Sequence, residues 1–275
     1  CIRDRARVDM ESRHGKLPGP GLTVIAYGSL GAGALGFDSD LDLIFLYQPT
    51  TILSDGKRPV PAERFHTGVA RRLLSLLSAS TPAGRLYSID ARLRPNGRAG
   101  LLVSSLDAFS RYQAEEAWVW ELQALTRARP VAGNTEIARR FTKIRHSVLT
   151  ASRDEHLIRK EIPAMRKRIL DEHGSADPLK HAPGGLLDIE FVAQFGILLN
   201  ATRYPELTTS TRIDKQLGLL QDCGWLDYDE TQALIDAFEQ LLDSRLRSAL
   251  LDQKPVSDQP SPLNIARSLC EDILR

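Results

Sequence analysis

Two aspartates separated by one residue, Asp40 and Asp42, are the residues whose type and spacing best suit chemistry in this sequence. They open an apolar stretch, Asp40–Tyr47, that is predicted to be a β-strand. Because side chains alternate along a strand, both carboxylates project from one face, with Cα atoms roughly 6.6 Å apart. Two carboxylates about 5 Å apart repel by roughly 3 kcal/mol at an effective dielectric near 20. A divalent cation compensates this repulsion, so the pair predicts a metal site.

A glycine-rich turn stands just before this pair. The apolar run Leu22–Tyr27 is predicted to be a strand that ends at Gly28 and Ser29, and residues 30–36 form a short helix or a wide loop. A glycine turn after a strand lets backbone N–H groups approach an anionic ligand. Such a turn is more often only a turn. The aspartates downstream favour its interpretation as part of a metal and nucleotide site.

A second strand, predicted at Arg85–Arg94, carries a third carboxylate. Alternation places Asp90, Arg92 and Arg94 on one face and apolar residues on the other. If this strand neighbours Asp40–Tyr47, Asp90 becomes a third metal ligand, and the two arginines reach phosphates bidentately. The alternative is an exposed sheet face with an Asp–Arg pair that contributes about 0–1 kcal/mol.

The surrounding segments predict helices packed on strands. Gln48–Pro61 is rich in proline and is expected to be a loop at the edge of the site. Glu63–Ser80 repeats its apolar residues at a helical period, with Arg71 and Arg72 off that face, which is typical of a surface helix. The order strand, helix, strand indicates a layered arrangement of both element types.

Residues 107–128 lack glycine and proline and are predicted to form one helix, capped by Ser105 or Asp107. Trp118 and Trp120 lie on this helix. Packing in a core or between domains is the favoured interpretation of the two indoles, and base stacking is the alternative.

The second half of the chain is predicted to be helical throughout. Pro130–Asn134 ends the preceding helix and is taken as the boundary between a domain of residues 1–132 and a domain of residues 133–275. Apolar stripes at helical spacing predict the core faces of a bundle: Ile158, Ile162, Met165 and Ile169 on one helix, and Leu234, Ala237, Phe238, Leu241, Leu242, Leu246 and Ala249 on another.

Pro183-Gly184-Gly185 opens the most apolar helix of this half. Asp188 and Glu190 fall in its first turns, where the helix dipole favours acids. Residues two apart on a helix do not share a face, so a second metal pair is not expected there. Phosphate binding by the glycine pair is the less favoured alternative.

Composition describes a globular protein without an extended basic surface. The 275 residues are 42% hydrophobic and 26% charged, with a net charge of +1, which does not favour nucleic-acid binding. The three cysteines are scattered, and neither a membrane-length apolar run nor a signal peptide is recognised, so a cytoplasmic location is expected. A start at Cys1 is typical of a piece of a longer protein.

Four motifs in this order resemble the glutamine synthetase adenylyltransferase family: GSLGAGALGFDSDLDLIFLY, LYSIDARLRPNGRAGLLVSS, YQAEEAWVWELQALTRARPVAG and KHAPGGLLDIEFVAQF. The resemblance runs from about Leu22 to beyond Phe195. Enzymes of this family are bifunctional, with two related nucleotidyltransferase halves. One half adenylylates a tyrosine of glutamine synthetase, and the other removes the adenylyl group by phosphorolysis. The AWVWELQALTRARPVAG motif resembles the C-terminal, adenylylating half more than the other.

The resemblance implies an α+β fold. A DNA polymerase beta-like nucleotidyltransferase domain, with a small mixed sheet and helices, is followed by an all-α helical bundle domain like that of PII uridylyltransferases. Gly28 and Ser29 correspond to the turn that holds the triphosphate of ATP. Many relatives have Lys in place of Ser29 and Gly in place of Ala32, although a serine hydroxyl also binds phosphate. The metal-binding, catalytic carboxylates correspond to Asp40, Asp42 and Asp90.

The implied reaction is transfer of AMP from ATP to a tyrosine of glutamine synthetase, assisted by two Mg²⁺ ions, with Arg92 or Arg94 neutralising developing charge. The implied partners are glutamine synthetase, the PII signal protein and glutamine as regulators, and the other half of a longer enzyme. Neither nucleic acid nor a membrane is implied. The phosphorolytic half and a regulatory module that binds nucleotide or PII without turnover remain alternatives.

Overall fold

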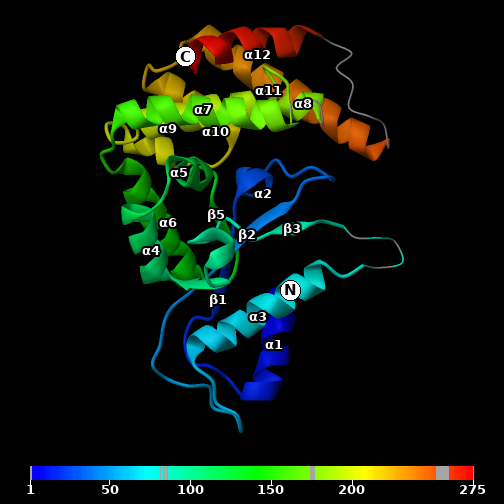
Figure 1. Cartoon of the computed structure of the whole chain (residues 1–275), viewed down its shortest axis with the longest axis vertical. Coiled ribbons are helices and arrows are strands. Elements are labelled where there is room, and N and C mark those ends of the chain that lie inside the picture. The colour runs from blue at the N-terminus through cyan, green and yellow to red at the C-terminus, as the bar shows by residue number, and fades with distance from the viewer. Residues whose placement is uncertain are drawn as a thin grey trace. The chain divides into compact units, whose positions relative to one another are not determined.

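The computed structural model describes residues 2–80, 82, 84, 86–173, 177–251 and 260–274. The chain forms two compact units whose elements are labelled in Figure 1. The first, here called the sheet unit, comprises Cys1–Gly31, Ser39–Ala117 and Ala128–Val148. The second, the helical unit, comprises Ala32–Asp38, Trp118–Arg127 and Leu149–Arg275.

The sheet unit is built on a mixed five-stranded sheet with the order β3-β2-β1-β5, in which β4 also pairs with β2. β1 is antiparallel to β2 and to β5, whereas β3 and β4 are parallel to β2. The strands are β1 (Leu22–Ala26), β2 (Leu41–Tyr47), β3 (Ile89–Asp90), β4 (Val103–Ser105) and β5 (Arg129–Ala132). A small mixed sheet with helices followed by a helical region confirms the predicted α+β fold class.

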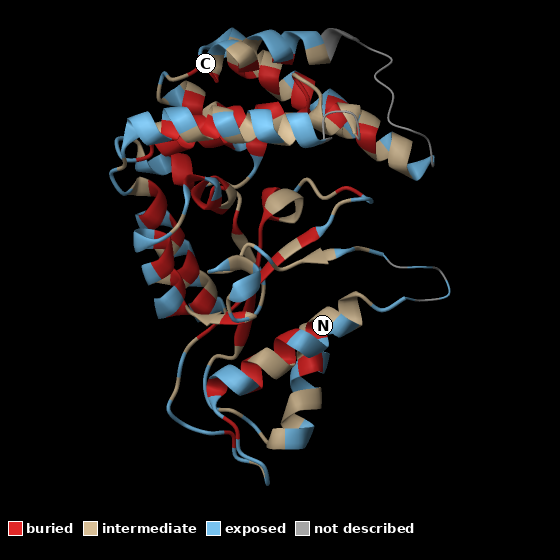
Figure 2. Cartoon of the chain, in the orientation of Figure 1, coloured by how far each residue is buried: buried red, intermediate tan, exposed pale blue. Residues whose placement is uncertain are grey.

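The two central strands form the core of this unit. Every residue of β1 is buried, as is nearly every residue of β2, and Figure 2 shows both strands coloured as buried along most of their length. The sequences of both strands are nearly continuous apolar runs. Such runs are expected where both faces of a strand are covered. The other helices of this unit are α1 (Ile2–His14), α3 (Ala62–Leu77), α4 (Leu106–Glu115) and α6 (Thr135–Thr150).

The predicted surface helix and its preceding loop are confirmed. α3 buries Phe65 and Val69 and leaves Arg71 and Arg72 exposed. It packs against α1 at Gly68, where an added Cβ would lie 2.4 Å from Met10 Cε. Within 48–61 the chain forms neither a helix nor a strand.

The predicted strand Arg85–Arg94 is wrong in its extent. Only Ile89 and Asp90 form a strand, while Arg85 lies outside the described residues. The Arg92 backbone N–H donates to Asp90 Oδ1 at 2.8 Å, which turns the chain away from the sheet. Asn96 then adopts a left-handed conformation with φ 60°, before the 3₁₀ helix η1 (Gly97–Ala99).

The predicted single helix over residues 107–128 is also wrong. It is two helices, α4 and α5 (Val119–Leu125). Ser105 is the N-cap of α4, since its hydroxyl accepts from the Ala108 N–H at 3.2 Å. The second helix has its own start, because the Trp118 N–H donates to the Glu121 carboxylate at 3.0 Å.

Both indoles of α5 lie at the surface. Trp118 is 65% exposed and Trp120 is 37% exposed. The prediction of packing in a core is therefore wrong, whereas packing between domains and base stacking stay predictions.

The division into units differs from the predicted boundary at residues 132 and 133. β5 pairs with β1, with Pro130 opposite Ile25. The 130–134 segment therefore returns the chain to the sheet, and α6 follows it within the sheet unit up to Val148.

The buried helix α9 is the centre of the helical unit. It begins after Gly185, as predicted. Ile158 and Ile162 of α7 are buried, and Met165 and Ile169 are half-buried. The helices of this unit are α5, α7 (Glu155–His173), α8 (Pro178–His181), α9 (Leu186–Asn200), α10 (Ile213–Asp222), α11 (Tyr228–Leu250) and α12 (Pro260–Ile273), with the 3₁₀ helix η2 (Pro205–Thr208). The predicted stripe of α11 is buried at Leu234, Ala237, Phe238 and Leu241 and half-buried at Leu242, Leu246 and Ala249.

Within the described residues, the segment Pro178–Asn200 is long and apolar enough to cross a membrane. The prediction that the chain has no apolar run of membrane length is therefore wrong. However, 72% of its apolar window is buried inside the protein. Its hydrophobicity is thus explained by its position in the core of the helical unit.

Candidate active site

The turn after β1 brings Gly28 against Asp42. The Tyr27 N–H donates to the Asp42 carbonyl at 2.9 Å, which extends the pairing of β1 with β2 by one residue. Gly28 has φ +54°, and a Cβ added there would lie 2.1 Å from Asp42 Oδ2. Both the backbone conformation and the close carboxylate therefore require glycine at this position.

β3 lies beside β2 in parallel register, with Asp42 opposite Asp90. Paired residues of neighbouring strands point to the same face, about 4.8 Å apart. Asp90 is expected to join the aspartates of β2 only if its own strand neighbours β2. The pairing of β3 with β2 meets this condition. Asp40 lies one residue before β2 and is exposed.

Arg92 is close to all three carboxylates. The hydrogen bond from Arg92 to Asp90 and the charge of Asp90 raise the pKa of the Arg92 guanidinium, and the charges of Asp42 and Asp40 add to this effect. The three acids thus share the neighbourhood of one exposed guanidinium.

Asp90 is held by Arg92 through both carboxylate oxygens. The Arg92 backbone N–H donates to Oδ1 at 2.8 Å, and Nε donates to Oδ2 at 2.6 Å. Burial raises the pKa of Asp90, but the hydrogen bonds and charge of Arg92 outweigh that effect and hold the pKa below its ordinary value. Asp90 therefore stays ionised at neutral pH.

Arg94 has a different place from Arg92. Its guanidinium donates to the carbonyls of Ala91, Gly100 and Arg98. These three bonds fold the turn that follows β3, so the structure brings Arg92 to the carboxylates and uses Arg94 to shape their loop.

Ser29 is the second residue of the short helix α2 (Gly28–Ala32) and is half-exposed. A residue that the sequence reading missed, Arg129 of β5, holds the end of this helix. Its Nε and Nη2 donate to the carbonyls of Gly31 and Leu30, each at 2.9 Å. Only the pairing of β5 with β1 brings Arg129 there, so local sequence carried no signal for it.

The carboxylates at this end of β2 suit magnesium. Mg²⁺ prefers oxygen ligands and is commonly bound by one or two carboxylates together with substrate phosphates, rather than by a closed protein cage. Asp42 and Asp90, side by side in register, offer such oxygens. Among the described residues, no group of three or more His, Cys, Asp or Glu side chains is arranged as a metal site, so Asp40, Asp42 and Asp90 do not form a closed metal site by themselves.

The acids of α9 are arranged differently. Asp188 is 3% exposed and accepts Arg166 Nε at 2.7 Å and the Gly184 N–H at 2.8 Å. Glu190 pairs instead with Arg127 Nη1 at 2.5 Å. The two acids are thus held by different partners, and an arginine neutralises each of them.

Comparison with known proteins identifies the family of this chain. Residues 4–144, just over half of the chain, match the family described as glutamate-ammonia ligase adenylyltransferase. Three relatives bear the name bifunctional glutamine synthetase adenylyltransferase/adenylyl-removing enzyme. That of Xanthomonas campestris pv. campestris is 41% identical over 91% of this chain, that of Xanthomonas axonopodis pv. citri 42% over 94%, and that of Chromobacterium violaceum 47% over 80%.

The aligned part of this chain spans 27%, 28% and 24% of the length of these three relatives, so each contains much more than the units described above. The family match covers β1, the turn at Gly28, and the strands that carry Asp42 and Asp90. This chain therefore belongs to the glutamate-ammonia ligase adenylyltransferase family, whose domain is a nucleotidyltransferase.

Proposed function

We propose that this chain transfers AMP from ATP to a tyrosine of glutamine synthetase, as the adenylylating half of a longer bifunctional enzyme. The observation that carries this proposal is the placement of Asp42 opposite Asp90, directly beside Gly28. The AWVWELQALTRARPVAG motif supports the choice of half, and the names of the relatives support glutamine synthetase as the acceptor protein.

In this proposal Asp40, Asp42 and Asp90 hold Mg²⁺. The bound metal supplies positive charge that neutralises the phosphates of ATP. Gly28 and Ser29 lie against the triphosphate, where backbone N–H groups and the serine hydroxyl donate to phosphate oxygens. Arg129 keeps this turn in place through Leu30 and Gly31.

The tyrosine oxygen attacks the α-phosphorus of ATP, an O–P bond forms, and the bond from that phosphorus to the bridging oxygen breaks as pyrophosphate leaves. Asp90 accepts the tyrosine proton. Its lowered pKa makes it a weak base while Arg92 holds it. We therefore assign Arg92 a second position, on a phosphate oxygen, which releases Asp90 when ATP is bound. Arg94 acts through the loop that carries Arg92.

The chain is further assigned a cytoplasmic location. The sheet unit is proposed to be the nucleotidyltransferase domain, and the helical unit is proposed to be a domain like that of PII uridylyltransferases. This helical part is proposed to contact glutamine synthetase or the other half of the enzyme. PII and glutamine are proposed as regulators of the whole enzyme.

The test is incubation of the 275-residue chain with purified glutamine synthetase, Mg²⁺ and ATP labelled on the α-phosphate. We expect label on glutamine synthetase and release of pyrophosphate. A parallel reaction contains adenylylated glutamine synthetase and inorganic phosphate. Release of ADP there, with no labelling in the first reaction, would reassign the chain to the phosphorolytic half. Failure of both reactions, with no Mg²⁺-dependent ATP binding, would favour a regulatory module.

A further inference from the structure

A cavity of about 210 Å³ lies within the sheet unit, at the end of β1 away from Gly28. Leu22, the first residue of β1, lines it, together with the backbone of Gly21 and Gly133. The run from Leu22 to Gly28 is roughly 20 Å at 3.3 Å per residue. The cavity is therefore separate from the carboxylates of the candidate active site and has no role in the proposed transfer.

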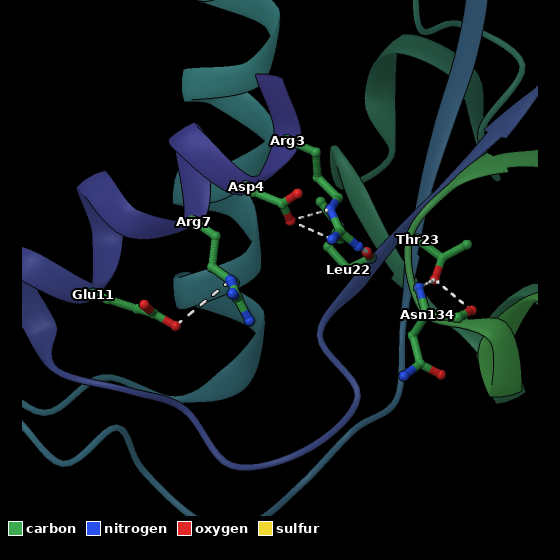
Figure 3. Close-up of polar contacts among 7 residues, drawn as sticks. All are labelled: Arg3, Asp4, Arg7, Glu11, Leu22, Thr23 and Asn134. Carbon is green, nitrogen blue, oxygen red and sulfur yellow. Dashed lines mark hydrogen bonds and ion pairs between the residues drawn. The ribbon is translucent and has the colours of Figure 1, made fainter. Parts of the chain in front are cut away.

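Three charged side chains of α1 line this cavity: Arg3, Arg7 and Glu11. Figure 3 shows Arg3 turned toward Asp4 and the Leu22 carbonyl, to which it donates. Arg7 lies one turn further along α1, and its Nε is 3.7 Å from Glu11 Oε1. That distance is too long for a hydrogen bond, so this ion pair leaves the guanidinium donors of Arg7 available for a ligand.

The part of the lining that comes from α3 is apolar except for one histidine ring. Phe65 and Val69 of α3 contribute the apolar surface. His66, beside them, is 4% exposed, and its Nδ1 has no hydrogen-bond partner within the described part of the chain. Burial lowers the pKa of His66 to about 4, so the ring is neutral near pH 7. A buried polar atom without a partner is costly, but Nδ1 itself is closed off from solvent, so His66 contributes a neutral ring to the wall of the cavity rather than a donor or acceptor for its contents.

We propose that this cavity binds a small organic monocarboxylate. Its carboxylate lies on Arg7, in the bidentate geometry that guanidinium and carboxylate groups favour, and its apolar body lies against Phe65 and Val69. This inference goes beyond the proposed function and does not depend on it.

Charge and size select this ligand class. Arg3 is already paired with Asp4, whereas Arg7 lies 3.7 Å from Glu11 without a hydrogen bond, so the lining offers one guanidinium, that of Arg7, to one carboxylate. Phosphate carries more than one negative charge near pH 7, so it would leave an excess beside Glu11. The volume is below the roughly 300–1,000 Å³ of pockets for drug-sized ligands, which indicates a compact molecule.

The test is titration of the full 275-residue chain, labelled with ¹⁵N-histidine, with butanoate and, separately, with inorganic phosphate. The His66 resonances are assigned from their loss in His66→Phe, and their shifts are followed by NMR. We expect saturable shifts of His66 with butanoate, and at least tenfold weaker binding of phosphate.

The matched variants are Arg7→Gln and Arg5→Gln. Arg5 is on the same helix and has the same kind of partner, Asp9 at 3.6 Å, but it does not line the cavity. Both side chains are more than half exposed, so both variants are expected to keep the melting temperature of the parent. Arg7→Gln should weaken butanoate binding at least tenfold, and Arg5→Gln less than twofold.

Three results would overturn the proposal. The first is the absence of a saturable shift at His66 with butanoate. The second is an equal loss of binding in the two arginine variants, which would indicate general attraction to a basic helix. The third is tighter binding of phosphate than of butanoate, which would replace the carboxylate class by phosphate. None of these results depends on whether the chain transfers AMP.

Discussion

The same spacing of two acids has opposite consequences in the two units. Asp40 and Asp42 stand at the start of a strand, whereas Asp188 and Glu190 stand at the start of a helix. At the strand, Asp42 lies opposite Asp90 of β3, and Asp40 is the exposed residue just before β2. In the helix, residues two apart diverge, and each acid is neutralised by its own arginine.

The difference shows how secondary structure decides what an acidic pair can do. At β2, Asp90 pairs with the exposed guanidinium of Arg92, and Asp42 lies opposite Asp90 in the sheet, so two carboxylates stand side by side. At α9, each acid is paired with an arginine in a nearly buried ion pair. Asp188 pairs with Arg166 of α7, and Glu190 pairs with Arg127, in the turn after α5. Carboxylates that lie together suit chemistry, and carboxylates that are separately paired maintain the fold.

The largest expected effect is on transfer by Asp42→Asn. Loss of one metal-binding carboxylate should lower the rate of AMP transfer by roughly a thousandfold or more, about 4 kcal/mol in activation free energy. The fold should persist, because the substitution relieves repulsion between acids. Rates are measured with α-labelled ATP, and melting temperatures serve as the control. Labelling of glutamine synthetase near the parent rate would remove Asp42 from the site.

The next largest effect is on stability, from Arg166→Met. It leaves the buried Asp188 without its arginine, which should lower the free energy of unfolding by about 3–4 kcal/mol. The exposed Arg168 of the same helix provides the control, since Arg168→Met should change stability by less than about 0.5 kcal/mol. Urea unfolding measures both. Equal stabilities of the two variants would contradict a structural role for Asp188.

His66 is a buried titratable residue, and its ring Nδ1 has no hydrogen-bond partner within the part of the chain that the structure describes. Its pKa is about 4 in the folded protein, below the ordinary 6.5. Between these values the unfolded chain binds more protons, so stability is fully present above pH 6.5 and is lost as the pH falls toward 4.

The expected loss from His66 is about 2–3 kcal/mol. Because other groups also titrate, the measurement is the difference in unfolding free energy between the parent and His66→Phe, at pH 7 and at pH 4.5. A difference that does not change with pH would show that His66 is not held neutral.

The smallest effect predicted here concerns Gly28→Ala. A residue with a Cβ at φ +54° is strained by about 1–2 kcal/mol, and its Cβ meets the Asp42 carboxylate. Stability should fall by that amount, and transfer should fall as well because Asp42 is displaced. The control is Gly218→Ala, since Gly218 lies in helix α10 and an added Cβ there meets no atom within 4 Å. Unchanged activity in Gly28→Ala would show that Asp42 moves without consequence.

Much of the sheet and of the site could be predicted because the signals are local. The apolar runs of β1 and β2, the glycine turn and the acidic pair all lie within one short stretch. The place of Asp90 followed from a condition, that its strand neighbours β2, which the pairing of β3 satisfies.

The rest depends on contacts between residues far apart in sequence. The break between α4 and α5 follows from where α5 packs: Arg127 pairs with Glu190, and Gln123 bonds Gln194 at 3.1 Å. Neither contact can be read from a window of helical sequence. The same holds for Arg129, which reaches Gly31 only because β5 pairs with β1.

The most direct test of the central claim, that the carboxylates of β2 and β3 act together on a nucleotide, is calorimetric titration of the 275-residue chain with ATP. It is performed with Mg²⁺ and then with EDTA, on the parent, on Asp42→Asn, and on Asp243→Asn, whose exposed acid pairs with Arg247. ATP should bind to the parent and to Asp243→Asn only with Mg²⁺, and at least tenfold more weakly to Asp42→Asn. Binding that is independent of Mg²⁺, or equal in the parent and Asp42→Asn, would contradict the account.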